Sequence, residues 1–324
     1  MLSTNNLNCL VFIRESENHG NSFSYRSAVF NFIVTSKFER VVFMAKRNRA
    51  MSSAKFKKWI KEGRGQGVGV NYKPWLTIHD VSSTGRSHRV NGFKINREHH
   101  FLSDHERDYF YIVEFADSVV DIREQYPLPL SDTLLIAEEL GIEHPQDVTT
   151  KDNYVLTTDM LLTISSGDKE IYLARTIKEK DELLKPRQME KFEIERRYWE
   201  KKAIDWGVVT ELEINKTLAN NLHNIRMSYD LSRLSLFSNM AEERIPRLID
   251  IFLGQAVNQF QSIQDLSDSF DIRYALRPGT GITLFHHLLL TKKLMVNLSS
   301  ELLDYERPIN IELYQNGLSS VIAK

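Results

Sequence analysis

Cysteine is almost absent from this chain of 324 residues, in which Cys9 is the only one. A single cysteine excludes an internal disulfide bond and a cysteine-built zinc site, and it is typical of a protein of the reducing cytoplasm. Long hydrophobic runs are also missing: no stretch of about 18 apolar residues occurs, so no membrane-spanning helix is expected. Since 42% of the residues are hydrophobic and 26% are charged, the composition indicates a globular protein with room for two domains.

Several common catalytic and metal-binding motifs are also absent. The chain contains neither a Walker A motif nor a serine nucleophile elbow. The segment Gly65-Gln-Gly-Val-Gly69 superficially resembles a dinucleotide fingerprint, but no apolar strand precedes it and its spacing is wrong. We interpret it as a flexible basic loop near a phosphate backbone. His99, His100 and His105 have no cysteine partner and no paired motif elsewhere, so a structural zinc site is not expected.

Acidic residues are scarce in the segment between Met44 and Phe101. Only Glu62, Asp80 and Glu98 oppose its 13 lysines and arginines, so this segment carries +10 in a chain whose net charge is −1. Such segregation favours a polyanion such as DNA as a partner, although a solvated basic face explains the same composition. The candidates for phosphate contact are Lys55, Lys57, Lys58, Lys61, Arg64, Lys73, Arg86 and Arg89.

The first 43 residues differ in texture from the rest of the chain. They are rich in Asn and Ser, and they lack the basic segment and clean apolar segment of a signal peptide. Met44-Ala-Lys-Arg-Asn48 has the character of a natural start. We therefore interpret residues 1–43 as a disordered leader or an upstream start assignment. The remainder divides into a first domain, residues 44–215, and a second domain, residues 216–324.

A hairpin in the first domain is the main structural signal. Residues 156–164 and 170–178 are apolar, β-branched and aromatic runs, and the Ser/Gly/Asp segment 165–169 between them is typical of a turn. Folding the two runs on this turn brings Asp159 and Lys178 to neighbouring positions at the far end. The pair is therefore expected to share one end of a small sheet.

Helical and strand patterns surround this hairpin. Together they predict an α/β fold in which helices flank a mixed sheet. The predicted elements are a helix over 102–116, a strand over 119–126, a helix over 133–140 ended by Gly141, a helix over 189–202 after a stop at Pro186, and a strand near 208–211.

The second domain has mainly helical periodicity. Helices are predicted over 244–260 and 284–293, followed by a hairpin of residues 293–298 and 309–314. Helices followed by a hairpin predict a winged-helix-like module.

An acid and a lysine at one end of apolar strands are typical of phosphodiester chemistry. Hydrolysis requires a metal ion that activates water and neutralises charge, which calls for clustered carboxylates and often a lysine. Asp159 and Lys178 supply one of each, and Glu106, in the first turn of the predicted helix, is the candidate third member. Glu195 is a candidate supporting acid near the same site.

Each of these residues also has a purely structural interpretation. Asp159 and Lys178 form an ordinary salt bridge at a sheet end in that interpretation. Ser103-Asp-His-Glu106 matches a capping box, in which the glutamate returns to the backbone amide of the N-cap residue. Glu195 would belong to a solvated helix face with ion pairs. The residues alone leave both interpretations open.

Longer runs in the first domain provide a more specific signal. From about residue 61 to residue 215 the chain resembles the TnsA family, the endonuclease subunits of heteromeric Tns-type bacterial transposases. The matching runs, which keep their order along the chain, are Lys61-Glu-Gly-Arg-Gly-Gln-Gly67, Pro74-Trp-Leu-Thr77, Gly85-Arg-Ser-His-Arg89, Leu102-Ser-Asp104, Asp121-Ile-Arg-Glu-Gln125 and Glu195-Arg-Arg-Tyr-Trp199.

The resemblance implies a restriction-endonuclease-like first domain and assigns its site. The family's helical catalytic acid corresponds to Glu106, its metal-binding aspartate to Asp159 and its lysine to Lys178. A further glutamate near the active site corresponds to Glu195. Two residues before the lysine the family has Gln or Glu, whereas this chain has Thr176, whose backbone carbonyl is then the auxiliary metal ligand.

The resemblance also implies a function and partners. It predicts a bacterial, cytoplasmic, Mg²⁺-dependent DNA endonuclease (with Mn²⁺ as a substitute) that cleaves the 5′ ends of a transposon. A TnsB-like transposase cuts the 3′ ends, and a TnsC-like ATPase binds the C-terminal domain. Thr176 favours an alternative, a catalytically silent scaffold that binds DNA and the ATPase in the same complex. A stand-alone restriction-type nuclease is a third interpretation.

Overall fold

The structure is a computed structural model that describes residues 53–81, 86–167, 169–257 and 261–313. The predicted leader of residues 1–43 lies outside the described residues. Within the described ranges, no helix combines the length and the apolar character needed to cross a membrane.

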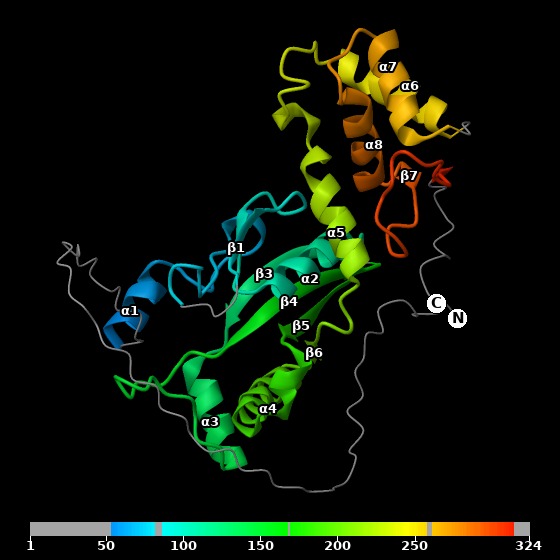
Figure 1. The fold of residues 1–324 in the computed structure, drawn as a ribbon. Coiled ribbons are helices and arrows are strands. Elements are labelled where there is room, and N and C mark those ends of the chain that lie inside the picture. Colours follow the sequence, from blue (N-terminus) through cyan, green and yellow to red (C-terminus); the bar gives the residue numbers. More distant parts are fainter. Residues whose placement is uncertain (1–52, 82–85, 168, 258–260, 314–324) are drawn as a thin grey trace, which may run out of the picture.

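A four-stranded mixed sheet forms the centre of the first part of the chain (Figure 1). Its strands, in spatial order, are β3 (Val119–Pro127), β4 (Thr157–Ser166), β5 (Lys169–Ile177) and β6 (Asp205–Val209). The pairs β3–β4 and β4–β5 are antiparallel, whereas β5–β6 is parallel. The predicted mixed sheet is thereby confirmed.

The predicted hairpin is the β4–β5 pair. Its register runs from Met160 opposite Arg175 to Ser166 opposite Lys169, so the connection is shorter than the predicted turn of residues 165–169. Gly167 follows the last paired residue of β4 with φ of +62°, a left-handed conformation that glycine adopts without steric cost. The hairpin places residue 159 near the end of β5, as the sequence predicted.

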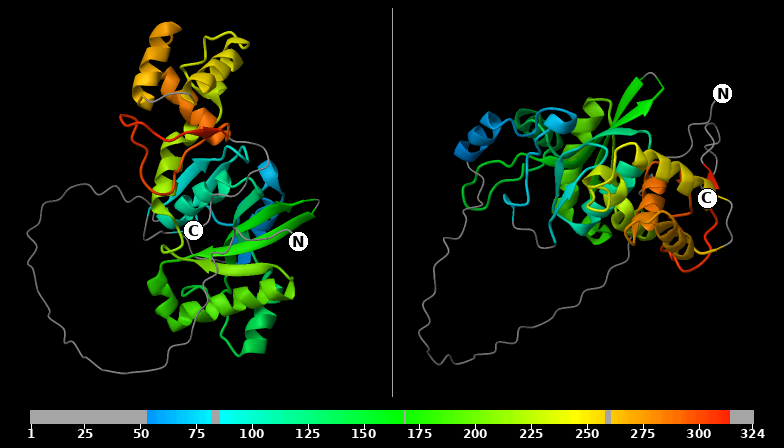
Figure 2. Two further views of the ribbon diagram at one scale, coloured as in Figure 1. Left: turned by 90° about the vertical axis from the view of Figure 1, so that its right-hand side faces the viewer. Right: turned by 90° about the horizontal axis from the view of Figure 1, so that it is seen from above.

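Helices cover both faces of the sheet (Figure 2). The alternation of side chains along β4 decides which residues each face buries. Met160 and Leu162 pack in the core shared with α2, whereas Leu161 packs with Ala174 in the core shared with α3 and α4. The three helices are α2 (Asp104–Phe115), α3 (Leu130–Leu140) and α4 (Pro186–Lys201). This helix-flanked mixed sheet fits a restriction-endonuclease-like fold.

Some predicted element boundaries agree with the structure and others differ by several residues. The strand predicted near 208–211 is β6, which begins at Asp205 and ends at Val209, and the helix predicted over 284–293 begins at Thr280 and ends at Leu290. Ser103 caps α2 and Gly141 ends α3 with φ of +65°, as predicted. Helix α3 begins three residues before the predicted start at Thr133. Pro186 was predicted as a stop, but it opens α4, because proline fits the first helical turn, where its missing N–H leaves no hydrogen bond unmade.

The segment before α2 contains two helices and a hairpin whose strands the sequence patterns did not predict. It consists of α1 (Ser53–Lys61), the short 3₁₀ helix η1 (Gly69–Asn71) and the antiparallel hairpin of β1 (His88–Asn91) and β2 (Glu98–Phe101). Trp59 and Trp75 pack edge to face with ring centroids 5.2 Å apart, and the backbone N–H of Trp75 donates to the Gln125 carbonyl at 3.2 Å. These contacts fix α1 beside β3.

The C-terminal part is mainly helical, as predicted, and gathers at one end of the molecule (Figures 1 and 2). Strands β7 and β8 pair antiparallel over only two residues each, within the predicted hairpin. The winged-helix assignment stays a prediction, as does the domain boundary at residue 215. The elements are α5 (Lys216–Ile225), η3 (Arg226–Ser228), η4 (Leu231–Arg233), α6 (Arg244–Ala256), α7 (Ile263–Arg273), α8 (Thr280–Leu290), β7 (Leu294–Met295) and β8 (Glu312–Leu313).

Helix α2 is held by the C-terminal part through a buried ion pair. Arg226 donates to Glu114 at 2.7 Å and to the backbone carbonyl of Asn91 at 2.9 Å. The two charged side chains are 8% and 1% exposed. Lys216 forms a second ion pair with Asp108 of α2 at 3.0 Å. The helix that carries Glu106 is thus packed against the sheet on one side and against α5 on the other.

Asp271 caps the N-terminus of α8, and this role can be tested by measuring stability. Its carboxylate accepts from the backbone N–H groups of Gly279, Thr280 and Gly281 at 2.8–3.1 Å. Asp271→Ala leaves these donors without a partner and is expected to lower the free energy of unfolding by about 1–2 kcal/mol. Denaturant titration measures the change. Asp268→Ala, at an exposed neighbouring position, serves as the control, and an equal loss in both variants would contradict the capping role.

Candidate functional site

Glu106, Asp159 and Lys178 converge at one end of the central sheet. Glu106 lies in the first turn of α2, Asp159 near the start of β4, and Lys178 directly after β5. The Asp159 Oδ2 atom accepts from the backbone N–H of Ile177 at 2.8 Å and lies 3.5 Å from Lys178 Nζ. The predicted acid–lysine neighbourhood is therefore present in the structure.

Gln125 of β3 connects the two carboxylates. Its Nε2 atom lies 3.3 Å from Glu106 Oε2 and 3.3 Å from Asp159 Oδ1. Its Oε1 atom accepts from the Thr157 hydroxyl at 3.2 Å, and the side chain is buried. Gln125 occurs in one of the runs quoted above, but no role was predicted for it. Its backbone φ of 48° within a strand was not evident from the sequence.

Glu106 takes part in the helix cap and faces the site at the same time, although its carboxylate accepts from the Leu102 N–H and not, as predicted, from that of the N-cap residue Ser103. Its backbone N–H donates to the Ser103 hydroxyl at 3.1 Å, and the hydroxyl donates to Glu106 Oε1 at 3.0 Å. Glu106 Oε2 accepts from the backbone N–H of Leu102 at 3.0 Å as well as from Gln125. The capping box holds the carboxylate in place at the positive end of the helix. The structural and functional interpretations of Glu106 are thus compatible.

Burial and neighbouring charges change the pKa values of Glu106 and Lys178. Burial and the neighbouring Asp159 carboxylate raise the pKa of Glu106 to about 7. The Asp159 carboxylate raises the pKa of Lys178 above its usual value, against the opposing effect of burial. Two adjacent acids that repel each other, with a lysine that stays protonated, form a site that a cation stabilises.

Glu195 and Thr176 form a buried pair beside this site. The hydroxyls of Thr176 and Thr158 both donate to Glu195 Oε1, at 2.6 and 2.5 Å. The indole N–H groups of Trp206 and Trp199 donate in turn to the two threonine hydroxyls. Burial raises the pKa of Glu195 to about 7. The Thr176 side chain is therefore engaged with α4, and Glu195 does not belong to a solvated helix face.

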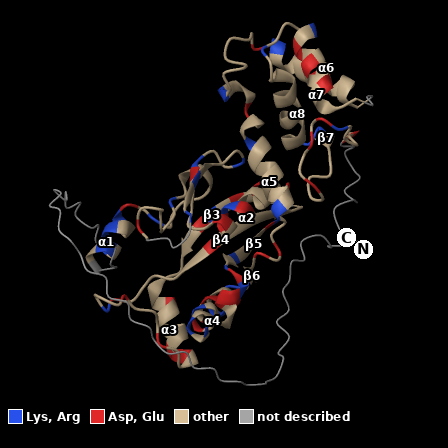
Figure 3. Ribbon diagram, in the orientation of Figure 1, with Lys and Arg blue, Asp and Glu red and all other residues tan. Residues whose placement is uncertain are grey.

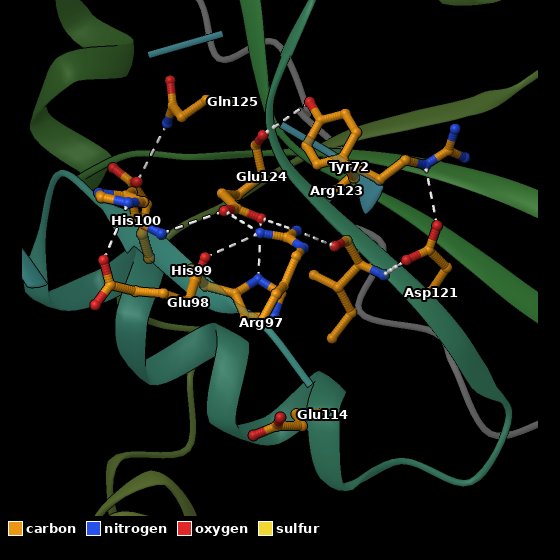
Figure 4. Close-up of polar contacts among 12 residues, drawn as sticks. Tyr72, Arg97, Glu98, His99, His100, Glu114, Asp121, Arg123, Glu124 and Gln125 are labelled. Atoms are coloured by element: carbon orange, nitrogen blue, oxygen red, sulfur yellow. Dashed lines mark hydrogen bonds and ion pairs between the residues drawn. The ribbon is translucent and has the colours of Figure 1, made fainter. Parts of the chain in front are cut away.

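A second buried network lies next to Gln125 along β3 (Figure 4). Glu124 is fully buried and accepts from both terminal nitrogens of Arg97, from His99 Nδ1 at 2.9 Å and from the backbone N–H of His100 at 3.2 Å. The Tyr72 hydroxyl donates to the Glu124 carbonyl at 3.0 Å. The β1–β2 hairpin is thereby fixed to the strand that carries Gln125, and His99 serves this network.

The predicted phosphate-contacting residues divide into two groups. Lys57 and Lys58 are exposed on α1, a helix that is rich in lysine (Figure 3). Arg64, in contrast, donates to Asp80 at 2.7 Å and to the Trp75 carbonyl at 3.1 Å. Lys73 donates to the Glu62 carbonyl at 3.0 Å. The remaining predicted contacts are Lys55 and Lys61 on α1, and Arg86 and Arg89, which are exposed near β1.

The donor set suits a hard divalent cation. Among the described residues, no group of three or more His, Cys, Asp and Glu side chains has the geometry of a metal site. Glu106 and Asp159 supply two carboxylates that are joined through one amide nitrogen. Mg²⁺ binds through one or two carboxylates and completes its shell with water and substrate oxygens, so two acids meet its needs. The pair therefore fits magnesium better than zinc.

Two family models match consecutive parts of the chain. Residues 116–211 match the model described as TnsA-like endonuclease N terminal, and residues 213–298 match TnsA endonuclease C terminal. Together the two matches cover more than half of the 324 residues. The chain is a TnsA-like protein. The predicted family resemblance is thus confirmed, and it extends into the C-terminal part.

A relative supports the same assignment. The TnsA-like chain is 45% identical over 179 residues to a protein from Escherichia coli named Transposon Tn7 transposition protein TnsA. The match covers 55% of this chain and 64% of the relative.

Proposed function

We propose that this TnsA-like protein is a Mg²⁺-dependent DNA endonuclease subunit that cleaves the 5′ ends of a transposon. It acts together with a TnsB-like transposase and a TnsC-like ATPase. The convergence of Glu106, Asp159 and Lys178 at one end of the sheet carries this proposal. The membership in a family of transposition endonuclease subunits supports it.

The site residues have distinct roles in hydrolysis. A divalent cation would be held by Glu106 and Asp159, with the Thr176 carbonyl as auxiliary ligand, and it would supply Lewis acidity and lower the pKa of a water molecule. Lys178 stays charged because Asp159 raises its pKa, so it orients the attacking water and stabilises the negative charge that develops on the phosphate. Glu195 holds the Thr176 hydroxyl and thereby the end of β5.

The test is cleavage of transposon-end DNA by the full chain with its transposase, its ATPase and Mg²⁺. Products that carry 5′-end cuts, and that disappear when the metal is chelated, are expected. Cleavage by the purified protein alone would instead favour a stand-alone nuclease.

The basic side chains of α1 predict a salt-dependent affinity for DNA. Lys57→Ala with Lys58→Ala is expected to weaken binding equally for unrelated DNA sequences, since lysine–phosphate contacts carry no base information. The slope of log affinity against log salt is expected to flatten by about 1 for each lysine–phosphate ion pair that the substitutions remove. Fluorescence anisotropy at several salt concentrations measures both effects. Lys201→Ala, on α4, is the control, and an equal effect there would contradict a role for α1.

A catalytically silent scaffold is the second candidate function. The Thr176 hydroxyl donates to Glu195 and is therefore committed away from the two carboxylates, which leaves the site with few side-chain ligands. The scaffold binds DNA and the ATPase but makes no cuts. It predicts the same cleavage products whether or not Asp159 and Lys178 are present, which distinguishes it from the endonuclease.

The C-terminal part provides the proposed ATPase contact. It lies at the end of the molecule opposite α4 (Figure 1) and packs on α2 through Arg226 and Lys216. A partner that binds the C-terminal part would therefore contact the region that packs on α2, the helix whose first turn carries Glu106. Loss of ATPase binding on removal of the residues after 215 is expected, and retained binding would contradict this assignment.

A further inference from the structure

Gln125 occupies the space between the two acids of the site. An amide nitrogen carries two hydrogens, so one group can donate to two carboxylates at once. Both contacts, to Glu106 Oε2 and Asp159 Oδ1, measure 3.3 Å. An amide oxygen in the same place would repel both acids, and the Thr157 hydroxyl already donates to it on the other side. The nitrogen therefore faces the carboxylates.

Other donors also hold the two acids, and Glu106 Oε1 accepts from the Ser103 hydroxyl. Glu106 Oε2 also accepts from the Leu102 N–H, and Asp159 Oδ2 accepts from the Ile177 N–H. These donors belong to a helix cap and a sheet end, so they fix the carboxylates in position without the amide. Gln125 is the side-chain donor that contacts both acids, and its amide can move because two torsions separate it from Cβ.

The backbone at Gln125 is itself unusual. Its φ of 48° lies in the left-handed region, which is uncommon for a residue with a side chain and here occurs within strand β3. The Trp75 N–H donates to the Gln125 carbonyl, and this contact helps to hold the conformation. The left-handed residue directs the side chain toward the two acids, whereas its neighbour Glu124 binds Arg97.

We infer that Gln125 is a positioning residue whose amide nitrogen takes the place of the cation between Glu106 and Asp159, and that metal binding displaces it. The inference rests on the proposed metal-dependent function. In the metal-free protein the amide offsets the mutual repulsion of two acids that other donors already hold in position. Because the amide and the cation compete for the same oxygens, Gln125 weakens metal binding and sets the metal concentration at which the site fills.

Metal titration of the full chain without DNA tests this role. Gln125→Gly removes the amide, and glycine adopts the left-handed backbone freely. Without the amide, the cation no longer has to displace two hydrogen bonds to charged groups, which are among the stronger ones in proteins. Mn²⁺ and Mg²⁺ are therefore expected to bind about five- to tenfold more tightly. Calorimetry measures the affinity. The shift of the melting temperature with metal provides a second readout and is expected to be larger in the variant than in the wild type.

Two further variants separate displacement from a general loss of structure. Thr157→Val removes the hydroxyl that holds the amide oxygen and leaves both carboxylates intact. It is expected to increase metal affinity in the same direction but less than Gln125→Gly. Gln146→Ala, at an exposed glutamine, is the matched control and is expected to leave the affinity unchanged.

Each other outcome overturns the inference in a recognisable way. Equal affinities of Gln125→Gly and the wild type would show that the amide does not compete with the cation. Weaker binding by Gln125→Gly would make Gln125 a metal ligand instead. If the wild type and Asp159→Ala take up metal equally, the metal site itself is wrong, and the proposed function fails together with the inference.

Discussion

Asp159→Ala is expected to reduce 5′-end cleavage by at least about 1,000-fold, the effect of removing about 4 kcal/mol of transition-state stabilisation. The carboxylate is buried, shares the Gln125 amide with Glu106 and lies 3.5 Å from the Lys178 ammonium. Lys178→Ala is expected to produce a loss of similar size, because it removes the charged donor nearest to Asp159. Single-turnover cleavage of transposon-end DNA with Mg²⁺ and the partner proteins measures both rates.

Two control variants separate a loss of catalysis from a loss of folding. Lys180→Ala changes an exposed lysine two residues further along the chain and is expected to retain the wild-type rate. Asp159→Asn preserves the side-chain shape and its contact with the Ile177 N–H but loses the negative charge, and an unchanged melting temperature of this variant assigns a lost rate to the site and not to folding. If the wild type and both alanine variants give equal products, the catalytic assignment is wrong, and the scaffold is the better description.

The sequence predicted the hairpin and the residues that converge at its open end. This was possible because apolar, β-branched and aromatic runs on either side of a Ser/Gly/Asp turn fix the pairing locally, and because a capping box marks the helix start at Ser103. The position of Asp159 beside Lys178 follows from that pairing alone. The approach of Glu106 to Asp159 depended on how α2 packs on the sheet, and the family resemblance supplied what the local pattern could not.

Gln125 and Glu124 show where the sequence was insufficient. A positive φ in the middle of a strand has no local signal at a glutamine, since it is imposed by contacts with Trp75, Thr157 and the two acids. The β1–β2 hairpin was not predicted because its strands, four residues each, contain mostly polar residues and show no clean alternation. Glu124, which forms the hydrogen bond with His99 of β2, lies 25 residues further along the chain.

The Glu124 network is expected to contribute strongly to stability. Glu124→Leu keeps a side chain of similar volume but leaves Arg97 buried without its counter-charge and His99 without its hydrogen-bond partner, which is expected to lower the free energy of unfolding by about 3–5 kcal/mol. Glu98→Leu, on the exposed side of the same hairpin, is the matched control, with an expected change within about 0.5 kcal/mol. Denaturant titration at neutral pH measures both. Equal changes in the two variants would contradict the role assigned to the buried carboxylate.

The same network predicts how stability depends on pH. Burial alone would raise the pKa of Glu124, but the charges and hydrogen bonds of His99 and Arg97 outweigh it and lower the pKa from 4.5 to about 2. A carboxyl whose pKa is lower in the folded state stabilises the protein above the unfolded-state value and loses this effect as the pH falls through the folded-state value. The stability difference between the wild type and Glu124→Leu is therefore expected to be full at neutral pH and to shrink from about pH 4.5 down to about pH 2. A difference that does not change over this range would show that the Leu variant loses packing instead of charge.

The double variant Glu124→Leu with Arg97→Leu distinguishes the two causes further, because removing both charges is expected to cost less than the sum of the single changes.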